Sequence, residues 1–249
     1  MATDALSIHI ASIINSSFKQ NIFPEELKHA KVVPVYKKGA VDDPHNDCPI
    51  SVLPCISKVF EKHICNQLQD FFNKTNILHS TQSGFRKGHS CQTALLHLVN
   101  KWATEIDKGN MVGTLFLDLS KAFDFVNHDL LLRKLAVYHF SQHSIDLFKS
   151  YLRNRKQLVQ IDNIRSSFEV IKTGVPQGSQ LGPLMFLSFI NDLPLYLHYS
   201  STDMYADDST LYTSDISISN LETILQKDLN RVLEWCYINK MNLPKKLCW

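Results

Sequence analysis

Two adjacent aspartates, Asp207 and Asp208, are the residues of this sequence whose type and spacing point most directly to chemistry. They stand between two short runs rich in Thr, Tyr and Met, which suit strands, so we expect them at a hairpin tip. Two carboxylates at one tip repel each other, and one would normally take up a proton. A divalent cation removes this repulsion, and hard oxygen ligands suit Mg²⁺. The alternative is an ordinary polar turn, because acidic turns are common.

A third acid, Asp118, stands near the end of the nearly continuous apolar run 111–119. Such a run is typical of a central strand that is buried on both faces. An aspartate at the end of a buried strand is costly unless it is paired or bound to a metal. If this strand neighbours the 202–213 hairpin in one antiparallel sheet, three carboxylates converge. That arrangement binds two metal ions that act on a phosphoryl centre.

The elements that must position these acids follow from the hydrophobic periodicity. Apolar residues at helical spacing predict helices over residues 4–19, 59–72, 91–106, 127–135, 144–153, 180–193 and 219–236. Ser219 and Glu222 fit a capping box at the start of the last helix. Residues 28–39 predict a short strand, residues 40–49 a loop, and residues 157–161 and 168–171 a second hairpin.

Composition sets the broad class of protein. The chain has 249 residues, 44% hydrophobic and 20% charged, which is enough for a sizeable core in one large domain or two small lobes. The six cysteines show no C-x-x-C and no paired spacing with histidine, so neither a zinc site nor a disulfide framework is indicated. A reduced, intracellular setting fits, and neither a signal peptide nor a membrane span is expected.

Basic segments indicate a polyanionic partner, although the net charge of +2 says little. The loop 81–88 is basic with one aromatic residue, and residues 149–172 hold six basic side chains against two acidic ones. Nucleic-acid contacts are therefore predicted for Arg86, Lys87, Arg153, Arg155 and Lys156. Ordinary solvated faces are the alternative. The turn 173–179 holds Gln177, which could bond a base or sugar edge, and Gly178, which lets a ligand approach closely; a plain loop before a helix is its alternative.

Three sequence blocks occur together in a fixed order: Phe-Leu-Asp-Leu-Ser-Lys-Ala-Phe-Asp at 116–124, Gly-Val-Pro-Gln-Gly-Ser at 174–179 and Tyr-Ala-Asp-Asp at 205–208. With them, the chain resembles the reverse transcriptase domain of non-LTR (LINE-type, jockey-like) retrotransposons. Residues 49–51, 83–88 and 235–246 add to the resemblance, which runs from about residue 18 to the end.

The resemblance implies an α+β, right-hand polymerase fold and an RNA-directed DNA polymerase activity. Residues 1–17 would be an N-terminal helical extension and 18–249 the reverse transcriptase domain. Fingers would occupy about 28–110 and the palm about 111–249, with an antiparallel palm sheet packed on helices and the thumb absent. The implied partners are an RNA template, a DNA primer and a dNTP, with no membrane. The implied cofactor is Mg²⁺, as two ions, with Mn²⁺ possible in its place.

The resemblance also assigns roles to individual residues. Asp118 and Asp207 would bind the catalytic metals, Asp208 would assist, and Leu119 belongs to the metal site. Phe123 would lie under the sugar as a steric gate against a 2′-hydroxyl. Further nucleotide contacts are implied for Lys37, Lys38, Gln177, Gly178, Tyr205 and Lys246, and Lys245 or Lys246 could protonate the leaving pyrophosphate.

The sequence departs from the family pattern at several positions. Asp47 and Cys48 stand where the family usually has Tyr-Arg, and a thiol cannot replace a guanidinium that holds the triphosphate. Phe125 replaces a small Thr, and residues 242–245 are one residue short of the usual motif. The alternative to an active polymerase is therefore a truncated, catalytically inactive remnant that folds and at most binds nucleic acid.

Overall fold

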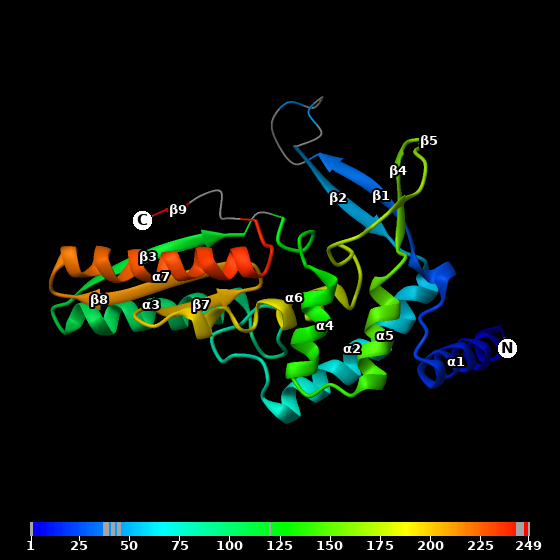
Figure 1. Ribbon diagram of the computed structural model, residues 1–249, viewed down its shortest axis with the longest axis horizontal. Helices are drawn as coiled ribbons and strands as arrows, with labels where there is room; N and C mark the ends of the chain where they lie inside the picture. Colours follow the sequence, from blue (N-terminus) through cyan, green and yellow to red (C-terminus); the bar gives the residue numbers. More distant parts are fainter. Residues whose placement is uncertain are drawn as a thin grey trace. The chain divides into compact units, whose positions relative to one another are not determined.

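The computed structural model describes residues 2–36, 40, 43, 46–119, 121–242 and 247–248. The chain forms two compact units, and each is built from two separate stretches of sequence (Figure 1). The first unit contains residues 1–71 and 128–185, and the second contains residues 72–127 and 186–249. Both units draw on residues from either side of position 110, so they do not follow the contiguous division 28–110 and 111–249, which stays a prediction.

The first unit combines a sheet with several helices. Its helices are α1 (Ala2–Gln20), η1 (Glu25–Lys28), α4 (His128–Val137), α5 (Gln142–Leu152), most of α2 (Cys55–Thr75) and the start of α6 (Gly182–Ile190). Its strands are β1 (His29–Tyr36), β2 (Asp47–Val52), β4 (Lys156–Ile161), β5 (Ile164–Arg165) and β6 (Glu169–Val170). The strand order is β2-β1-β4-β5, and β6 also pairs with β4. Helices at 4–19, 59–72, 127–135 and 144–153 were predicted, and all are present.

Strand β2 was not predicted, because residues 40–49 read as a loop. It runs antiparallel to β1 and places Pro49 opposite Pro34. Pro34 lies beyond residues 29–32, which pair with β4, so each proline is on a strand segment with a neighbour on one side only. Proline is tolerated there because no interior hydrogen-bond ladder is interrupted.

The second predicted hairpin closes earlier than expected. Ile161 pairs with Ile164, so Asp162 and Asn163 form the turn, and Asp162 takes the left-handed φ of 50° that Asp tolerates. Strand β6 pairs with the beginning of β4, at Gln157. The predicted antiparallel pairing of 157–161 with 168–171 is thus confirmed at the beginning of β4, and the connection between them contains the additional short strand β5.

The second unit is organised around a four-stranded sheet with the order β7-β8-β3-β9. Its strands are β3 (Met111–Asp118), β7 (Ser201–Tyr205), β8 (Asp208–Asp215) and β9 (Leu247–Cys248). Its helices are α3 (Cys91–Asp107), η3 (Leu193–Tyr196), α7 (Ile218–Ile238) and the end of α6. The buried side chains of α6, among them Phe186, Phe189 and Ile190, make it almost wholly a core helix.

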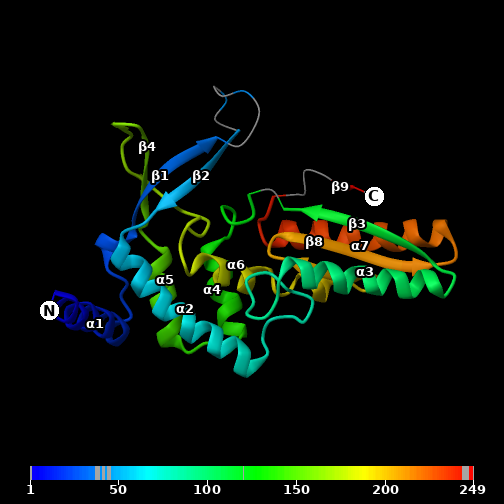
Figure 2. The ribbon, with the colours of Figure 1, turned by 180° about the vertical axis from the view of Figure 1, so that it is seen from behind.

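Two helices cover opposite faces of this sheet (Figures 1 and 2). A Cβ on Gly113 would meet Leu225 at 3.1 Å and Leu221 at 3.3 Å, so α7 packs on the face of β3 that carries Gly113, Leu115 and Leu117. The opposite face faces α3, and there Phe116 stays 45% exposed. The expectation that β3 is buried on both faces is wrong toward its acidic end.

Helix boundaries agree with the predictions except in local detail. Helix α7 begins after Ser217, which makes no side-chain cap, so Ser219 already lies within the helix and the predicted capping box is wrong. Helix α3 instead has a capping box, formed by Ser90 and Thr93. Within the described residues, no helix has both the length and the apolar character needed to cross a membrane.

Candidate active site

The two aspartates lie at a hairpin tip, as predicted. Strands β7 and β8 are joined by the two-residue turn Ala206-Asp207, and the last cross-strand pair is Tyr205 opposite Asp208. Ala206 takes a φ of 57°. Two-residue hairpins require positive φ at the first turn position, where glycine is usual and an L residue costs roughly 1–2 kcal/mol. The turn therefore needs support from outside the hairpin.

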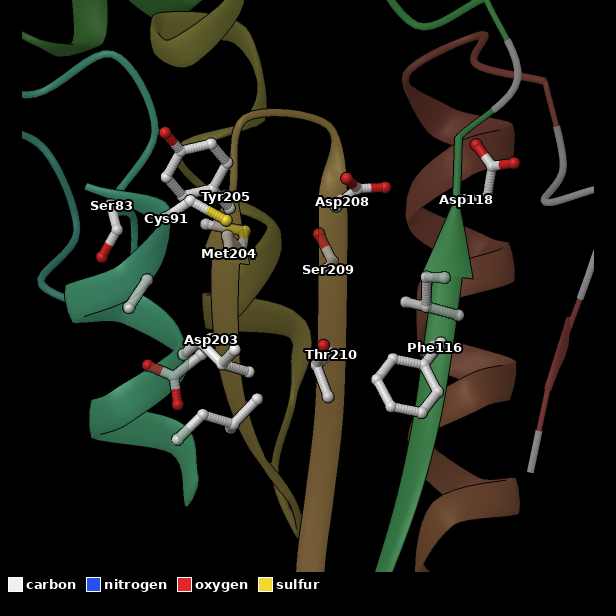
Figure 3. Close-up of a pocket in the computed structure, with 14 residues that line it drawn as sticks. Ser83, Cys91, Phe116, Asp118, Asp203, Met204, Tyr205, Asp208, Ser209 and Thr210 are labelled. Carbon is white, nitrogen blue, oxygen red and sulfur yellow. The ribbon is translucent and has the colours of Figure 1, made fainter. Parts of the chain in front are cut away.

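Asp118 lies at the same end of the sheet. It is the last residue of β3 and pairs directly with Asp208, the first residue of β8. Directly opposed residues project from the same face, so these two side chains share one (Figure 3). The prediction that the 111–118 strand neighbours the 202–213 hairpin is confirmed.

The three carboxylates interact electrostatically. Partial burial raises the pKa of Asp207, and the neighbouring charges of Asp208 and Asp118 raise it further, while a backbone N–H lowers it. Two of the four influences on this carboxyl are like charges, and no cationic side chain is among them. Such a group holds its proton more firmly than an ordinary aspartate, unless a cation takes the proton's place.

The predicted convergence into one ligand set is not formed. Among the described residues, no three acidic, histidine or cysteine side chains are close enough together to hold a metal ion. Asp208 starts strand β8, whereas Asp207 lies in the turn, where the sheet register does not fix the direction of its side chain. Mutual repulsion also favours separation. The donor chemistry fits a hard divalent cation, because all three side chains offer carboxylate oxygens at one end of one sheet.

A cavity of about 470 Å³ lies beside the acids, between α3 and the exposed face of the sheet (Figure 3). Asp118, Asp208 and Tyr205 line it together with the apolar side chains of Leu95, Leu98, Phe116 and Met204. Cys91, a free thiol, is also in its wall. The acids therefore stand at the edge of a mostly apolar hollow, which no sequence pattern indicated.

Further along the same face, α3 is tied to the sheet by polar contacts. Lys101 donates to Asp203 at 3.2 Å and to the Tyr212 hydroxyl at 2.8 Å. The carboxylate of Glu105 accepts from Ser214 at 2.8 Å. These contacts fix the helix that forms one wall of the cavity.

The sequence interpretation missed Gln82. Its side chain is 1% exposed and makes three hydrogen bonds, two of them to the backbone of Ala206. Nothing in the sequence pattern distinguishes this glutamine from a surface loop residue, since the contact joins residues 124 positions apart.

The predicted steric gate, Phe123, belongs to an aromatic cluster. Its ring stacks on Phe186, with centroids 4.4 Å apart, and lies edge-on to Phe85 at 6.2 Å. It is half-buried, so it is attached to the core on one side. Its role toward a sugar stays a prediction. Leu119 is buried, and its carbonyl accepts from the amide of Ala122 at 3.2 Å.

Gln177 and Gly178 lie in the first unit, against strand β2. The amide of Ser51 donates to the Gln177 carbonyl at 2.9 Å. Gly178 takes a φ of 112°, and a Cβ there would lie 2.5 Å from the Ser51 oxygen. The close backbone approach that the glycine permits is made by the protein itself. Nucleotide contacts of both residues stay a prediction.

The predicted nucleic-acid contact of Arg155 is wrong, because its side chain is buried. It is 1% exposed, its guanidinium lies 4.7 Å from the ring centroid of Tyr151, and its charge acts on the buried Glu61. It is therefore a core residue that offsets a buried carboxylate and cannot reach a nucleic acid. A run of basic residues does not reveal which of them faces inward.

The other predicted basic contacts remain accessible to different degrees. Lys87, Arg153 and Lys156 are exposed, although Arg153 lies 3.7 Å from Asp129. Arg86 donates to the carbonyls of His79 and Gln82, so it also holds its own loop. Lys37, Lys38, Lys245 and Lys246 lie outside the described residues, as does the side chain of Cys48.

Comparisons with known proteins agree with this geometry. The family described as reverse transcriptase (RNA-dependent DNA polymerase) matches residues 36–248. The probable RNA-directed DNA polymerase from transposon BS of Drosophila melanogaster is 33% identical over 250 residues, covering 96% of this chain and 28% of that protein. The RNA-directed DNA polymerase from mobile element jockey of the same species is 32% identical, covering 91% of this chain and 25% of that protein.

Solved structures give the same fold. Apo telomerase from Candida tropicalis aligns with a TM-score of 0.64 at 10% identity, covering 98% of this chain and 49% of that chain. The chain spans only 28% of the length of the transposon BS protein and 25% of that of the jockey protein. Its ordered motifs, the sheet that joins Asp118 to the Asp207–Asp208 hairpin and the family match identify it as a reverse transcriptase domain, related to those of non-LTR retrotransposons.

Proposed function

We propose that this chain is the catalytic domain of an RNA-directed DNA polymerase that adds deoxynucleotides to a DNA primer on an RNA template. The primer 3′-oxygen attacks the α-phosphorus of a dNTP, its proton is lost, and pyrophosphate leaves. The observation that carries this proposal is the β3–β8 register, which puts Asp118 opposite Asp208 with Asp207 in the adjoining turn. No other described part of the sheet brings three acids to one end.

Asp118, Asp207 and Asp208 would hold two Mg²⁺ or Mn²⁺ ions, with the Leu119 carbonyl as a further oxygen donor. When bound, such ions lower the pKa of the attacking hydroxyl and neutralise the charge on the phosphates. The chain's own contribution is position. The sheet register fixes Asp118 against Asp208, and burial together with the neighbouring carboxylates raises the pKa of Asp207, so a bound cation would offset the repulsion that favours its proton.

The substrate contacts follow from the family. In the right-hand description, residues of about 28–110 form fingers and those of about 111–249 form the palm. Nucleotide contacts are proposed for Phe123, Tyr205, Gln177, Gly178, Lys37, Lys38 and Lys246. Template and primer contacts are proposed for Lys87, Arg153 and Lys156, with Arg86 in part. Arg155 is no longer among them, because it is buried.

Nucleic-acid binding without polymerisation is the second candidate function. Asp47 and Cys48 favour it, since they occupy the position where a triphosphate-binding Arg is usual in the family. Register places Cys48 opposite Val35 and Asp47 opposite Tyr36, so both belong to the β1–β2 ribbon. On this second reading the acids persist, but nucleotide addition is feeble or absent.

Primer extension on an RNA template, with Mg²⁺ and separately with Mn²⁺, decides between the two functions. Asp118→Asn should lower extension by about 10³-fold or more, since it removes a metal ligand and changes little in shape. The matched control is Asp162→Asn, an exposed turn residue with a φ that Asn accepts equally. Extension that survives Asp118→Asn would overturn the polymerase mechanism. RNA binding with no extension in either metal would favour the second function.

A further inference from the structure

Ala206, the first residue of the two-residue turn, has no backbone partner within its own hairpin. The last cross-strand pair is Tyr205 with Asp208, which leaves the turn's own N–H and C=O groups outside the ladder. Ala206 is also buried, at 8% exposure, so water does not readily satisfy them. Buried backbone polar groups must be hydrogen-bonded, and a turn at positive φ must be held by its surroundings.

The side chain of Gln82 supplies both missing partners. Its Oε1 accepts from the Ala206 amide at 3.0 Å, and its Nε2 donates to the Ala206 carbonyl at 3.2 Å. The same Oε1 accepts from the Gly84 amide at 2.7 Å, which fixes the orientation of the carboxamide. The amide therefore acts toward Ala206 as a neighbouring strand would, with one donor and one acceptor.

The backbone around Gln82 is docked on β7 as well. Met204 donates to the Thr81 carbonyl at 2.9 Å, and Ser83 donates to the Met204 carbonyl at 2.8 Å. Gln82 thus lies between two backbone hydrogen bonds that attach the 81–83 segment alongside β7, and it forms a parallel bridge with Met204. This attachment sets how far its side chain reaches along the hairpin.

Gly84 completes the contact. A Cβ at this position would lie 2.2 Å from the Ala206 nitrogen and 2.8 Å from its Cα. Only a glycine lets the 81–84 segment come this close to the turn. The segment is therefore fitted to the turn both by hydrogen bonds and by shape.

We propose that Gln82 is a positioning residue that holds the Ala206-Asp207 turn and thereby sets the placement of Asp207 and Asp208 relative to Asp118. The effect on catalysis rests on the proposed function. The support of the turn by the hydrogen bonds between Gln82 and Ala206 does not depend on that function. The partners of the Gln82 side chain are backbone groups of Ala206 and Gly84, so no substrate contact is proposed for it. It acts through the backbone of Ala206, one residue before the first acid of the pair.

The test uses Gln82→Met, which keeps the length of the side chain and removes all three hydrogen bonds. Gln226→Met is the matched control, because Gln226 is exposed on α7 in the same unit and its side chain donates to the neighbouring side chain of Asn230 on that helix. Amide hydrogen exchange at Ala206 should become at least 10-fold faster in Gln82→Met and stay unchanged in the control. The affinity for Mn²⁺ should fall several-fold in Gln82→Met and stay unchanged in the control. It is measured by titration, with free Mn²⁺ followed by its electron paramagnetic resonance signal.

In primer extension, Gln82→Met should lower kcat about 10-fold or more with little change in the KM for dNTP, since no substrate contact is lost. Gln82→Glu keeps the two acceptor bonds and loses the donor, so it should fall between wild type and Gln82→Met. If Gln82→Met does not fold, Gln82→Glu decides: intermediate exchange at Ala206 supports the proposal, and wild-type exchange overturns it.

Exchange and Mn²⁺ binding need no catalysis, so the inference can be judged even if the chain does not polymerise. Absence of extension by the wild-type chain would count against the proposed function only. Unchanged amide hydrogen exchange at Ala206 in Gln82→Met would show that Gln82 does not support the turn. Faster exchange with unchanged Mn²⁺ affinity would show that this support does not position the two acids, and would overturn the positioning role.

Discussion

Two buried or half-buried carboxyls, Glu61 in the first unit and Asp207 in the second, both have a raised pKa, but their surroundings are opposite in kind. Burial dominates for each. Around Glu61 every further influence stabilises the charged form: the Gln180 amide at 2.7 Å, the Tyr151 hydroxyl at 3.0 Å, the Ser57 hydroxyl at 3.4 Å and the charge of Arg155. Around Asp207 the side chains that act on it are two more carboxylates.

The direction of the pKa shift is the same for both carboxyls, so it does not distinguish them, whereas the groups that surround them do. Glu61 is a satisfied group that connects α2 to α5 and to the segment before α6. Asp207 is left with like charges and a single backbone N–H, so the fold gains nothing from its ionised form. A carboxylate that destabilises its own surroundings is a candidate for binding something the chain does not itself supply.

The largest expected effect is on activity, at Asp207. Asp207→Asn should lower primer extension by about 10³-fold or more, because the carboxylate proposed to bind metal is replaced by a neutral amide. The melting temperature should not fall, since the substitution also removes repulsion. Extension and thermal melts of the same preparations measure both. A variant that loses both activity and stability would place Asp207 in the same class as Glu61.

The next largest effect is on stability, at Glu61. Glu61→Ala should cost about 3 kcal/mol, because it leaves the Tyr151 hydroxyl and the Gln180 amide without their shared acceptor and the buried Arg155 without its opposite charge. Urea unfolding measures the loss. A cost below about 1 kcal/mol would mean that water replaces the carboxylate, and the contrast with Asp207 would lose its structural half.

A smaller loss of stability is expected when Gly178 is replaced, and this substitution tests why a glycine is needed at that position. Gly178→Ala should cost about 2 kcal/mol or more, since its φ is 112° and a Cβ would lie 2.5 Å from the Ser51 oxygen. Gly109→Ala is the matched control: its φ is 86° but the space around it is open, so about 1 kcal/mol is expected. Urea unfolding measures the free energy of unfolding of both variants. Equal losses would show that the close contact between Gly178 and the Ser51 oxygen on β2 is not the reason for the glycine.

The smallest effect is the pH dependence that Asp207 contributes. Its pKa is raised in the folded state above the ordinary 3.8, so the folded state holds this proton more tightly than the unfolded state. The contribution therefore favours folding at acid pH and is lost as pH rises through the raised pKa.

Asp207→Asn removes this contribution, so its advantage over wild type should grow with pH above 3.8 and then level off, at less than about 1 kcal/mol for a partly exposed group. Urea unfolding of both proteins across pH 4–7, without divalent cations, measures it. An advantage that shrinks as pH rises would contradict the direction of the shift.

Much of the second unit could be predicted from sequence. The apolar run of β3, the Thr- and Tyr-rich flanks of the Asp207–Asp208 pair and the periodicity of α7 are local patterns, and each produced the expected element. The adjacency of β3 and the hairpin was only a condition for the three acids to converge, and the family resemblance turned it into a prediction, which the register confirms. The closed ligand set did not follow, because side-chain directions at a turn depend on its backbone conformation.

What could not be predicted rests on contacts between residues distant in sequence. Gln82 reads as a loop residue until Ala206 is placed against it, and Arg155 reads as one of a basic group until Glu61 is placed near it. Strand β2 contains a proline and follows a polar stretch, so its pairing with β1 overrides its local propensity. The deciding partner is 124 positions away for Gln82 and 94 positions away for Arg155, and it lies on another strand for β2.

The interleaving of the two units has a consequence for synthesis on the ribosome. Asp118 and its partner Asp208 are 90 positions apart, and 58 of the intervening residues, 128–185, belong to the first unit. Strand β3 therefore emerges long before β8, with an unpaired edge and an apolar face that α7 has yet to cover. A nascent chain that ends before residue 215 holds Asp118 without the whole of β8, and α7 is complete only at Ile238, so a chaperone that binds apolar strands has its longest opportunity during this interval.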